Sequence, residues 1–132
     1  MKIAAERSSL SGQVLIPASK SHTIRALILA SLAAGKSTIM NPLDSADTRS
    51  CVHTCRALGA RIEEGKQWTV WGLDGPPKPP GETIDVANSG TTLFLALSAA
   101  SLADDWIEFT GDDQTRRRSA GPLLASLQDL GV

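Results

Sequence analysis

A cluster of hydroxyls and cations near the start of the chain is the strongest candidate for chemistry. Ser19-Lys20-Ser21 stands just before an apolar periodic run, Ile24 to Ala34, that predicts a helix. A helix N-terminus attracts anions through its free N–H groups and the positive end of its macrodipole. Lys20 and Arg25 would add two full charges, and an arginine can bind a phosphate in a bidentate manner. The pattern predicts a phosphate or carboxylate site, with simple N-capping by serine as the alternative.

A second cluster, Asn88-Ser89-Gly90-Thr91-Thr92, has the same character. It combines a capping amide and hydroxyls with a glycine that allows a ligand to approach the backbone closely. A capped turn is again the alternative. Because the two clusters belong to equivalent parts of a repeat, we expect their helix N-termini to face one side of the molecule and to converge on one anion. Neither cluster is a nucleotide-binding P-loop, since the glycine-rich run before Lys-Ser is absent.

Two further charged groups have weaker signals. Arg116-Arg117-Arg118 follows Gly111-Asp112-Asp113, whose acidic residues partly neutralise it. Such a basic run is ordinarily exposed to solvent on the surface. The more specific alternative is that it contacts a single small anion. Asp47 is most simply a helix cap, with the orientation of a nearby lysine as the alternative. Neither His22 nor His53 has an evident serine or cysteine partner of catalytic type.

The two cysteines, Cys51 and Cys55, are four residues apart on one face of a predicted helix. His53 points nearly the opposite way. A zinc site needs about four ligands, usually from two separated pairs, and the sequence has no second pair. We therefore interpret both cysteines as reduced, buried or half-buried thiols and expect no metal site.

Composition and charge exclude several classes of protein. With 132 residues, 42% of them hydrophobic, the chain is long enough for one domain with a mainly aliphatic core. Thirteen basic and fourteen acidic residues give a net charge of −1, so we expect neither a nucleic-acid partner nor a membrane surface, and any anion site must be local. The first residues are polar, and the longest apolar stretch, Ala26 to Ala34, is short. The sequence therefore predicts neither a secretory signal nor a membrane span. We therefore expect a cytoplasmic protein.

The elements that would position these side chains occur in two similar sets. The first comprises a strand at 13–16, a helix at 24–34, a strand at 37–41, a helix through 58, and a hairpin of strands at 60–63 and 67–71. A connector rich in proline and glycine follows at 74–81. The second set comprises a strand at 83–86, a helix to about 102, a strand at 106–110 and a helix to 130.

The similarity of the two sets predicts an internal repeat. Ser21-x-Thr23 aligns with Ser89-x-Thr91 at an offset of 68, which is 89 minus 21. Leu58-Gly59-Ala60 aligns with Leu130-Gly131-Val132 at 72, which is 130 minus 58, so four residues are inserted in the second copy. The hairpin that follows the first Leu-Gly-Ala has no counterpart after Val132. We therefore expect a partner, or a further C-terminal part, to cover the open sheet edge and helix faces.

Four motifs, in order, resemble those of the 3-phosphoshikimate 1-carboxyvinyltransferases, the enolpyruvylshikimate-phosphate synthases. Pro17 to Leu27 resembles the family's Pro-Gly-Ser-Lys-Ser…Arg-Ala-Leu motif, and Leu43 to Thr48 resembles Leu-x-Ser-x-Asp-Thr. Asn88 to Thr91 and Gly111 to Arg118 resemble Asn-Ala/Ser-Gly-Thr and Gly-Asp…Arg-Pro. The resemblance covers nearly the whole chain.

The resemblance implies an α/β (α+β) fold of repeated βαβαββ units, three to each of two domains, with helix N-termini facing an interdomain cleft. Residues 1–16 would contain a strand that packs with the other domain, and 17–132 would be a partial N-terminal domain. Unit one would run from about 17 to 75 and unit two from about 82 to 132, so the chain would end after about one and a half to two units.

The resemblance also implies a reaction and its residues. The enolpyruvyl group of phosphoenolpyruvate would pass to the 5-hydroxyl of shikimate 3-phosphate through a tetrahedral intermediate, with loss of phosphate and without a metal or organic cofactor. The residues implied for shikimate 3-phosphate are Lys20, Ser21, Arg25 and Thr91. Those implied for phosphoenolpyruvate are Lys20, Asn88, Gly90 and Arg118. Lys20, as a proton carrier, and Asp47 are the implied catalytic residues.

Three residues depart from the family motifs. Phe94 stands where an arginine is common, Ser119 replaces the proline after Arg118, and Ala18 replaces a glycine. The missing arginine removes one anion contact, so we expect the affinity for phosphoenolpyruvate, or the tolerance of inhibitors that mimic it, to differ. The family's other substrate and acid–base residues belong to a C-terminal part that is absent here, so we expect the chain alone to be inactive.

Two other functions fit parts of the sequence. A UDP-N-acetylglucosamine enolpyruvyl transferase, which shares the fold, is disfavoured because Ser21 rather than asparagine follows Lys20 and because no cysteine lies beyond Cys55. The remaining alternative is a non-catalytic phosphate-binding module, or one half of a split enzyme that needs a C-terminal partner.

Overall fold

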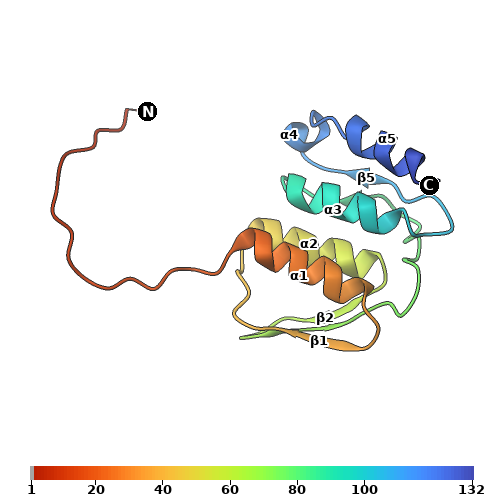
Figure 1. Ribbon diagram of the computed structural model, residues 1–132, viewed down its shortest axis with the longest axis horizontal. Coiled ribbons are helices and arrows are strands. Elements are labelled where there is room, and N and C mark those ends of the chain that lie inside the picture. The colour runs from red at the N-terminus through yellow and green to blue at the C-terminus, as the bar shows by residue number, and fades with distance from the viewer. Residues whose placement is uncertain (1) are drawn as a thin grey trace.

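The N-terminal segment precedes the folded part of the chain. The computed structural model describes residues 2–132, and residues 2–19 contain no helix or strand and run away from the other elements (Figure 1). The strand predicted at 13–16 is therefore wrong for this chain, because a strand needs a partner edge for its hydrogen bonds. Leu15 is 97% exposed. Packing of residues 1–16 with another domain stays a prediction, and Met1 lies outside the described residues.

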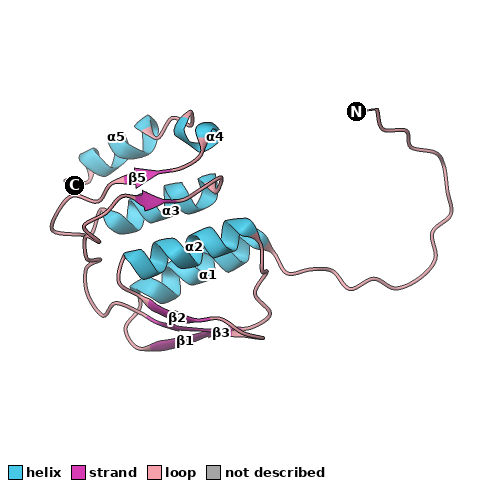
Figure 2. Ribbon diagram, turned by 180° about the vertical axis from the view of Figure 1, so that it is seen from behind, coloured by secondary structure: helices cyan, strands magenta, loops and turns pink. Residues whose placement is uncertain are grey.

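The first unit consists of two helices on a three-stranded sheet. Its elements are α1 (Lys20–Leu32), β1 (Lys36–Ile39), α2 (Ala46–Ala57), β2 (Arg61–Glu63) and β3 (Trp68–Trp71). The strand order is β1-β3-β2, and both outer strands are antiparallel to β3. Helices α1 and α2 cover one face of this sheet (Figure 2). The predicted hairpin is confirmed, and α1 begins at Lys20 rather than at Ile24.

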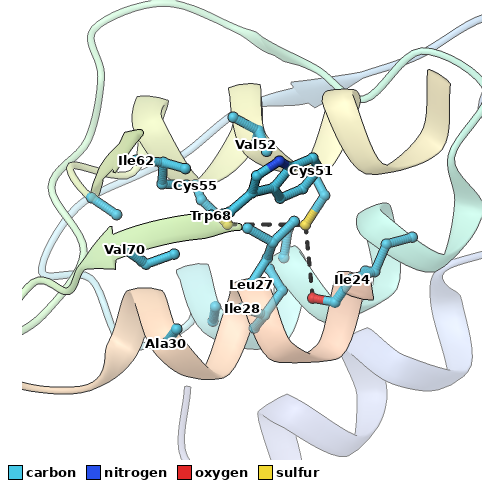
Figure 3. Close-up of a cluster of buried hydrophobic side chains, with 13 residues drawn as sticks. Ile24, Leu27, Ile28, Ala30, Cys51, Val52, Cys55, Ile62, Trp68 and Val70 are labelled. Carbon is cyan, nitrogen blue, oxygen red and sulfur yellow. Dashed lines mark hydrogen bonds between the residues drawn. The ribbon is translucent and has the colours of Figure 1, made fainter. Parts of the chain in front are cut away.

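The main core lies between these two helices and the sheet (Figure 3). Ile24 and Leu27 of α1 and Val70 of β3 are fully buried, and Val52 of α2 is 1% exposed. Burial of one aliphatic side chain of this size contributes roughly 1.5–3 kcal/mol. This cluster therefore fixes α1 and α2 beside each other.

Cys51 and Cys55 are part of that core. Both side chains are fully buried, and their Sγ atoms lie 4.0 Å apart (Figure 3). Hydrogen bonding with Cys55, together with burial, raises the pKa of the Cys51 thiol. The prediction of reduced, buried thiols is confirmed.

The second unit is smaller and lies on the side of α1 and α2 that faces away from the first sheet (Figure 2). Its elements are β4 (Ile84–Asp85), α3 (Gly90–Ala100), β5 (Phe109–Thr110), α4 (Asp113–Arg116) and α5 (Gly121–Asp129). Strands β4 and β5 are parallel. No helix of residues 2–132 is long and apolar enough to cross a membrane.

The single helix predicted up to residue 130 is wrong. The chain forms α4 and α5 instead, with a break at residues 117–120. Pro122 has no N–H and is tolerated only in the first turn of a helix, so it belongs to the start of α5 and not to the interior of a longer helix.

The repeat is present, but its alignment differs from the predicted one. Ser19 caps α1 and Ser89 caps α3, so the offset of these helices is 70 (89 minus 19) rather than 68. Ser45 caps α2 and Asp112 caps α4 at an offset of 67, which is 112 minus 45. The second copy is thus shorter between its first two helices and longer after α4 begins, where the break at 117–120 lies.

Gly72, directly after β3, lies against the end of α1. A Cβ atom at Gly72 would overlap the carbonyl oxygen of Ala33 and lie 2.6 Å from that of Ala30. Because backbone atoms cannot move aside cheaply, we expect Gly72→Ala to lower the free energy of unfolding by about 1–3 kcal/mol. Urea denaturation followed by tryptophan fluorescence measures this. The control is Gly75→Ala, whose Cβ would enter open space. Equal stabilities of the two variants would contradict this packing.

Candidate functional site

The N-termini of α1, α2 and α3 lie at one end of the molecule, the end from which residues 2–19 depart (Figure 1). A pocket of about 310 Å³ lies there. It is lined by residues from four separate segments: Lys20, Ala46, Asp47, Ala87, Asn88, Ser89 and Arg118. The structure thus brings the two predicted anion-binding clusters together with Asp47 and one arginine of the basic run.

Two larger hollows lie elsewhere, between α3, β5 and α5. Their volumes are about 550 and 420 Å³, and their walls are mostly aliphatic and aromatic. Neither contains Lys20, Asp47 or Asn88, although Arg118 also lines the smaller of the two. We therefore take the smaller, polar pocket as the candidate site.

Lys20 and Asp47 form an ion pair at the mouth of the pocket. The Lys20 Nζ lies 3.2 Å from the Asp47 Oδ2, and the side chains are 44% and 30% exposed. An ion pair exposed to this extent is worth only about 0–1 kcal/mol, so its main effect is on orientation. The interpretation of Asp47 as a residue that orients a nearby lysine agrees with this geometry. The cap of α2 comes instead from Ser45, which accepts a hydrogen bond from the Thr48 N–H.

Arg118 packs directly against Gly90. A Cβ atom at Gly90 would lie 2.8 Å from the Arg118 Cζ, so only glycine allows the guanidinium this close to the start of α3. Among residues 2–132, no carboxylate forms an ion pair with Arg118. Its neighbour Arg116, by contrast, pairs with Asp113. Arg118 therefore brings an uncompensated positive charge to the pocket.

The loop before α3 supplies the remaining wall. The Asn88 Nδ2 donates to the Gln114 Oε1 of α4 at 3.3 Å. Ser89 is buried, and its Oγ accepts from the Thr92 N–H and lies 2.7 Å from the Thr92 Oγ1. Asp112 caps α4, and the hydrogen bond from the Thr115 backbone N–H lowers the pKa of its carboxyl group.

The electrostatics of the pocket favour an anion. Lys20 and Arg118 outweigh the single carboxylate of Asp47 by one positive charge. Each converging helix adds about half a positive charge at its N-terminus. A compact, multiply charged anion is the ligand that this combination suits.

Four of the predicted site residues do not line the pocket: Ser21, Arg25, Gly90 and Thr91. Ser21 and Arg25 are four residues apart on α1, so they share one face of that helix. Arg25 is exposed, and Thr91 is half-buried on α3. These side chains do not line the pocket that holds Lys20, Asn88 and Arg118.

Sequence reasoning missed two features of the site. One is Gln114, which contacts Asn88 only through the tertiary fold. The other is the backbone of Ala87, whose φ is +49°. Nothing in an alanine signals that conformation, which ordinarily favours glycine.

Gly90→Ala should displace the Arg118 guanidinium without unfolding the chain. Loss of a charge-assisted contact of this kind is worth about 1.5–3 kcal/mol, so we expect affinity for inorganic phosphate to fall by about tenfold or more. Isothermal titration calorimetry measures this affinity for phosphate. The control is Gly121→Ala, where the nearest atom to the new Cβ is 3.4 Å away. Unchanged phosphate affinity in Gly90→Ala would contradict this role of Arg118.

Comparisons with known proteins show the family of this chain. The family model described as EPSP synthase (3-phosphoshikimate 1-carboxyvinyltransferase) matches residues 4–132. Curated relatives with the name 3-phosphoshikimate 1-carboxyvinyltransferase include that of Acetivibrio thermocellus, at 52% identity, and that of Methanothermobacter thermautotrophicus, at 47%. These matches cover 100% of this chain but only 31% and 32% of the relatives.

A solved structure has the same fold. EPSP synthase from Acinetobacter baumannii superposes with a TM-score of 0.81 at 25% identity, over 92% of this chain and 28% of that chain. The chain thus spans about a third of the length of the curated relatives that it matches. The four ordered motifs, the family match along almost the whole chain and the shared fold lead to one conclusion: the chain belongs to the EPSP synthase (3-phosphoshikimate 1-carboxyvinyltransferase) family.

Proposed function

We propose that the protein to which this chain belongs transfers the enolpyruvyl group of phosphoenolpyruvate to the 5-hydroxyl of shikimate 3-phosphate and releases phosphate. Its place would be the shikimate pathway, in the cytoplasm. The observation that carries this proposal is the single pocket in which Lys20 and Arg118 meet the N-termini of three helices. In this proposal the chain supplies part of the site, and the rest of the protein supplies the remainder.

Phosphoenolpyruvate is the substrate that we assign to this pocket. It is compact and carries both a phosphate and a carboxylate, which suits two cations beside converging helix dipoles. Lys20, Asn88, Gly90 and Arg118 are the proposed contacts. Because these groups are held by caps and by packing before a ligand arrives, little reorganisation is needed at the moment of reaction.

Shikimate 3-phosphate would bind beside this pocket. Ser21 and Arg25 share a face of α1 and, with Thr91 of α3 and with Lys20, are the proposed contacts. The Arg25 side chain is exposed and forms no ion pair within residues 2–132, so it is available to a phosphate.

The proposed chemistry needs a proton at two steps. The 5-hydroxyl oxygen adds to C2 of phosphoenolpyruvate while a proton adds to C3, which gives the tetrahedral intermediate. The proton of the 5-hydroxyl leaves to a base as its oxygen bonds to C2. Loss of one proton of the C3 methyl group and of phosphate then restores the double bond. We assign proton transfer to Lys20, oriented by the Asp47 carboxylate 3.2 Å away.

Of the three residues that depart from the family motifs, Phe94 is the one that we expect to affect function. It lies half-buried in the second turn of α3 and is not part of the pocket wall. We propose that the missing arginine charge alters the affinity for phosphoenolpyruvate or for inhibitors that mimic it.

A chimera tests the proposal. In it, this chain replaces the matching segment of the Acetivibrio thermocellus relative, and phosphate release is measured with both substrates. We expect activity, and we expect Lys20→Met to lower kcat by about 100-fold or more, as the loss of a general acid–base catalyst does. The control is Lys66→Met, in the exposed turn between β2 and β3. A folded but inactive chimera, or equal activity of Lys20→Met and the control, would contradict the proposal.

The alternative is a non-catalytic phosphate-binding module or one half of a split enzyme. In that case Lys20, Asn88 and Arg118 would bind phosphate in the pocket without turnover by this chain alone. Mixing this chain with a separately expressed remainder of that relative distinguishes the two. Activity restored from two separate chains indicates a split enzyme, whereas phosphate binding without activity in the chimera indicates the module.

A further inference from the structure

The turn that carries Asn88 to the pocket has a backbone that alanine rarely adopts. Residues Val86–Ser89 form a turn closed by a 3.0 Å hydrogen bond from the Ser89 N–H to the Val86 carbonyl. Its first central residue, Ala87, has a φ of +49°, whereas Asn88 does not have a positive φ. In turns of this kind glycine is the favoured residue at that position. Some other interaction must therefore hold Ala87 in place.

Two hydrogen bonds hold the peptide groups of Ala87. The Asp85 Oδ1 accepts from the Ala87 N–H at 2.8 Å. The Ala87 carbonyl accepts from the Asp112 N–H at 3.0 Å. The second bond requires a close approach at Gly111, where a Cβ atom would lie 2.7 Å from the Ala87 oxygen.

The turn is also fixed on both sides. The Ser50 Oγ of α2 donates to the Val86 carbonyl at 2.7 Å, and the Asn88 amide donates to Gln114 of α4. These contacts place Asn88 and Ser89 on the pocket wall. Asp85 itself is exposed and is not part of that wall. Its carboxylate acts on the turn, not on the pocket.

We propose that Asp85 is a positioning residue for the anion pocket. Its carboxylate holds Ala87 in the left-handed conformation and thereby sets the direction of Asn88. This inference rests on the proposed function and goes beyond it, because it gives a role in binding to a side chain that does not touch the pocket.

The experiment uses the chimera described above and compares four variants for KM, kcat and melting temperature. Asp85→Ala removes the acceptor, and Asp85→Asn keeps an oxygen that can accept the same bond. Asp85→Ala combined with Ala87→Gly removes the acceptor but allows φ near +49° at no steric cost. Asp105→Ala is the control, because the Asp105 Oδ1 accepts from the Trp106 N–H at 2.7 Å in the same local manner, away from the pocket.

We expect Asp85→Ala to raise the KM for phosphoenolpyruvate by about two- to tenfold, the effect of one lost hydrogen bond. Its kcat should be nearly unchanged, and its melting temperature should fall no more than that of Asp105→Ala. Asp85→Asn, and the double variant with Ala87→Gly, should recover a KM near that of the parent chimera.

Three outcomes would overturn the inference. An unchanged KM in Asp85→Ala, with an active parent chimera, refutes the role of Asp85 and leaves the proposed function standing. A raised KM that Ala87→Gly does not restore shows that the carboxylate acts by its charge and not through Ala87. A folded parent chimera without activity refutes the proposed function and this inference with it.

Discussion

The site depends on three helix N-termini being held side by side at one end of the molecule. Their positive ends repel one another, and even a full charge beside one helix end interacts with it by only about 0.3–1 kcal/mol. Each large side chain buried between α1, α2 and the first sheet contributes roughly 1.5–3 kcal/mol, so the aliphatic core around Ile24, Val52 and Val70 outweighs that repulsion. The positive potential is therefore built into the packing, and a bound anion relieves it.

Helix caps determine which charged side chains lie at the helix ends that this packing brings together. Ser19 starts α1 one residue before Lys20, and Ser45 starts α2 two residues before Asp47, so both charged groups lie in a first turn and meet at 3.2 Å. The second unit adds an uncompensated cation, because Gly90 leaves room for Arg118 against the start of α3. A change that moved any of these caps by one turn would separate the groups.

Local patterns in the sequence predicted most of the elements and several residues that line the pocket. Capping hydroxyls and apolar periodicity are local signals, and they located α1, α2, α3 and the clusters around Lys20 and Asn88. The predictions that failed depended on contacts between residues that are distant in the sequence. The strand at 13–16 has no partner edge among residues 2–132, and the final helix breaks before Pro122. The left-handed backbone of Ala87 is held by Asp85 and Asp112, and only the folded chain brings Asp112 near. The 68-residue offset failed because two serines near α1 both resembled its cap.

The most direct test of this account is a crystal structure of the chimera with phosphoenolpyruvate bound. We expect the phosphate and the carboxylate to lie in the pocket between the starts of α1, α2 and α3, within hydrogen-bonding distance of Lys20 and Arg118, with Asn88 on the wall. Phosphoenolpyruvate bound in either apolar hollow beside α5, or bound without contact to Lys20 and Arg118, would contradict it.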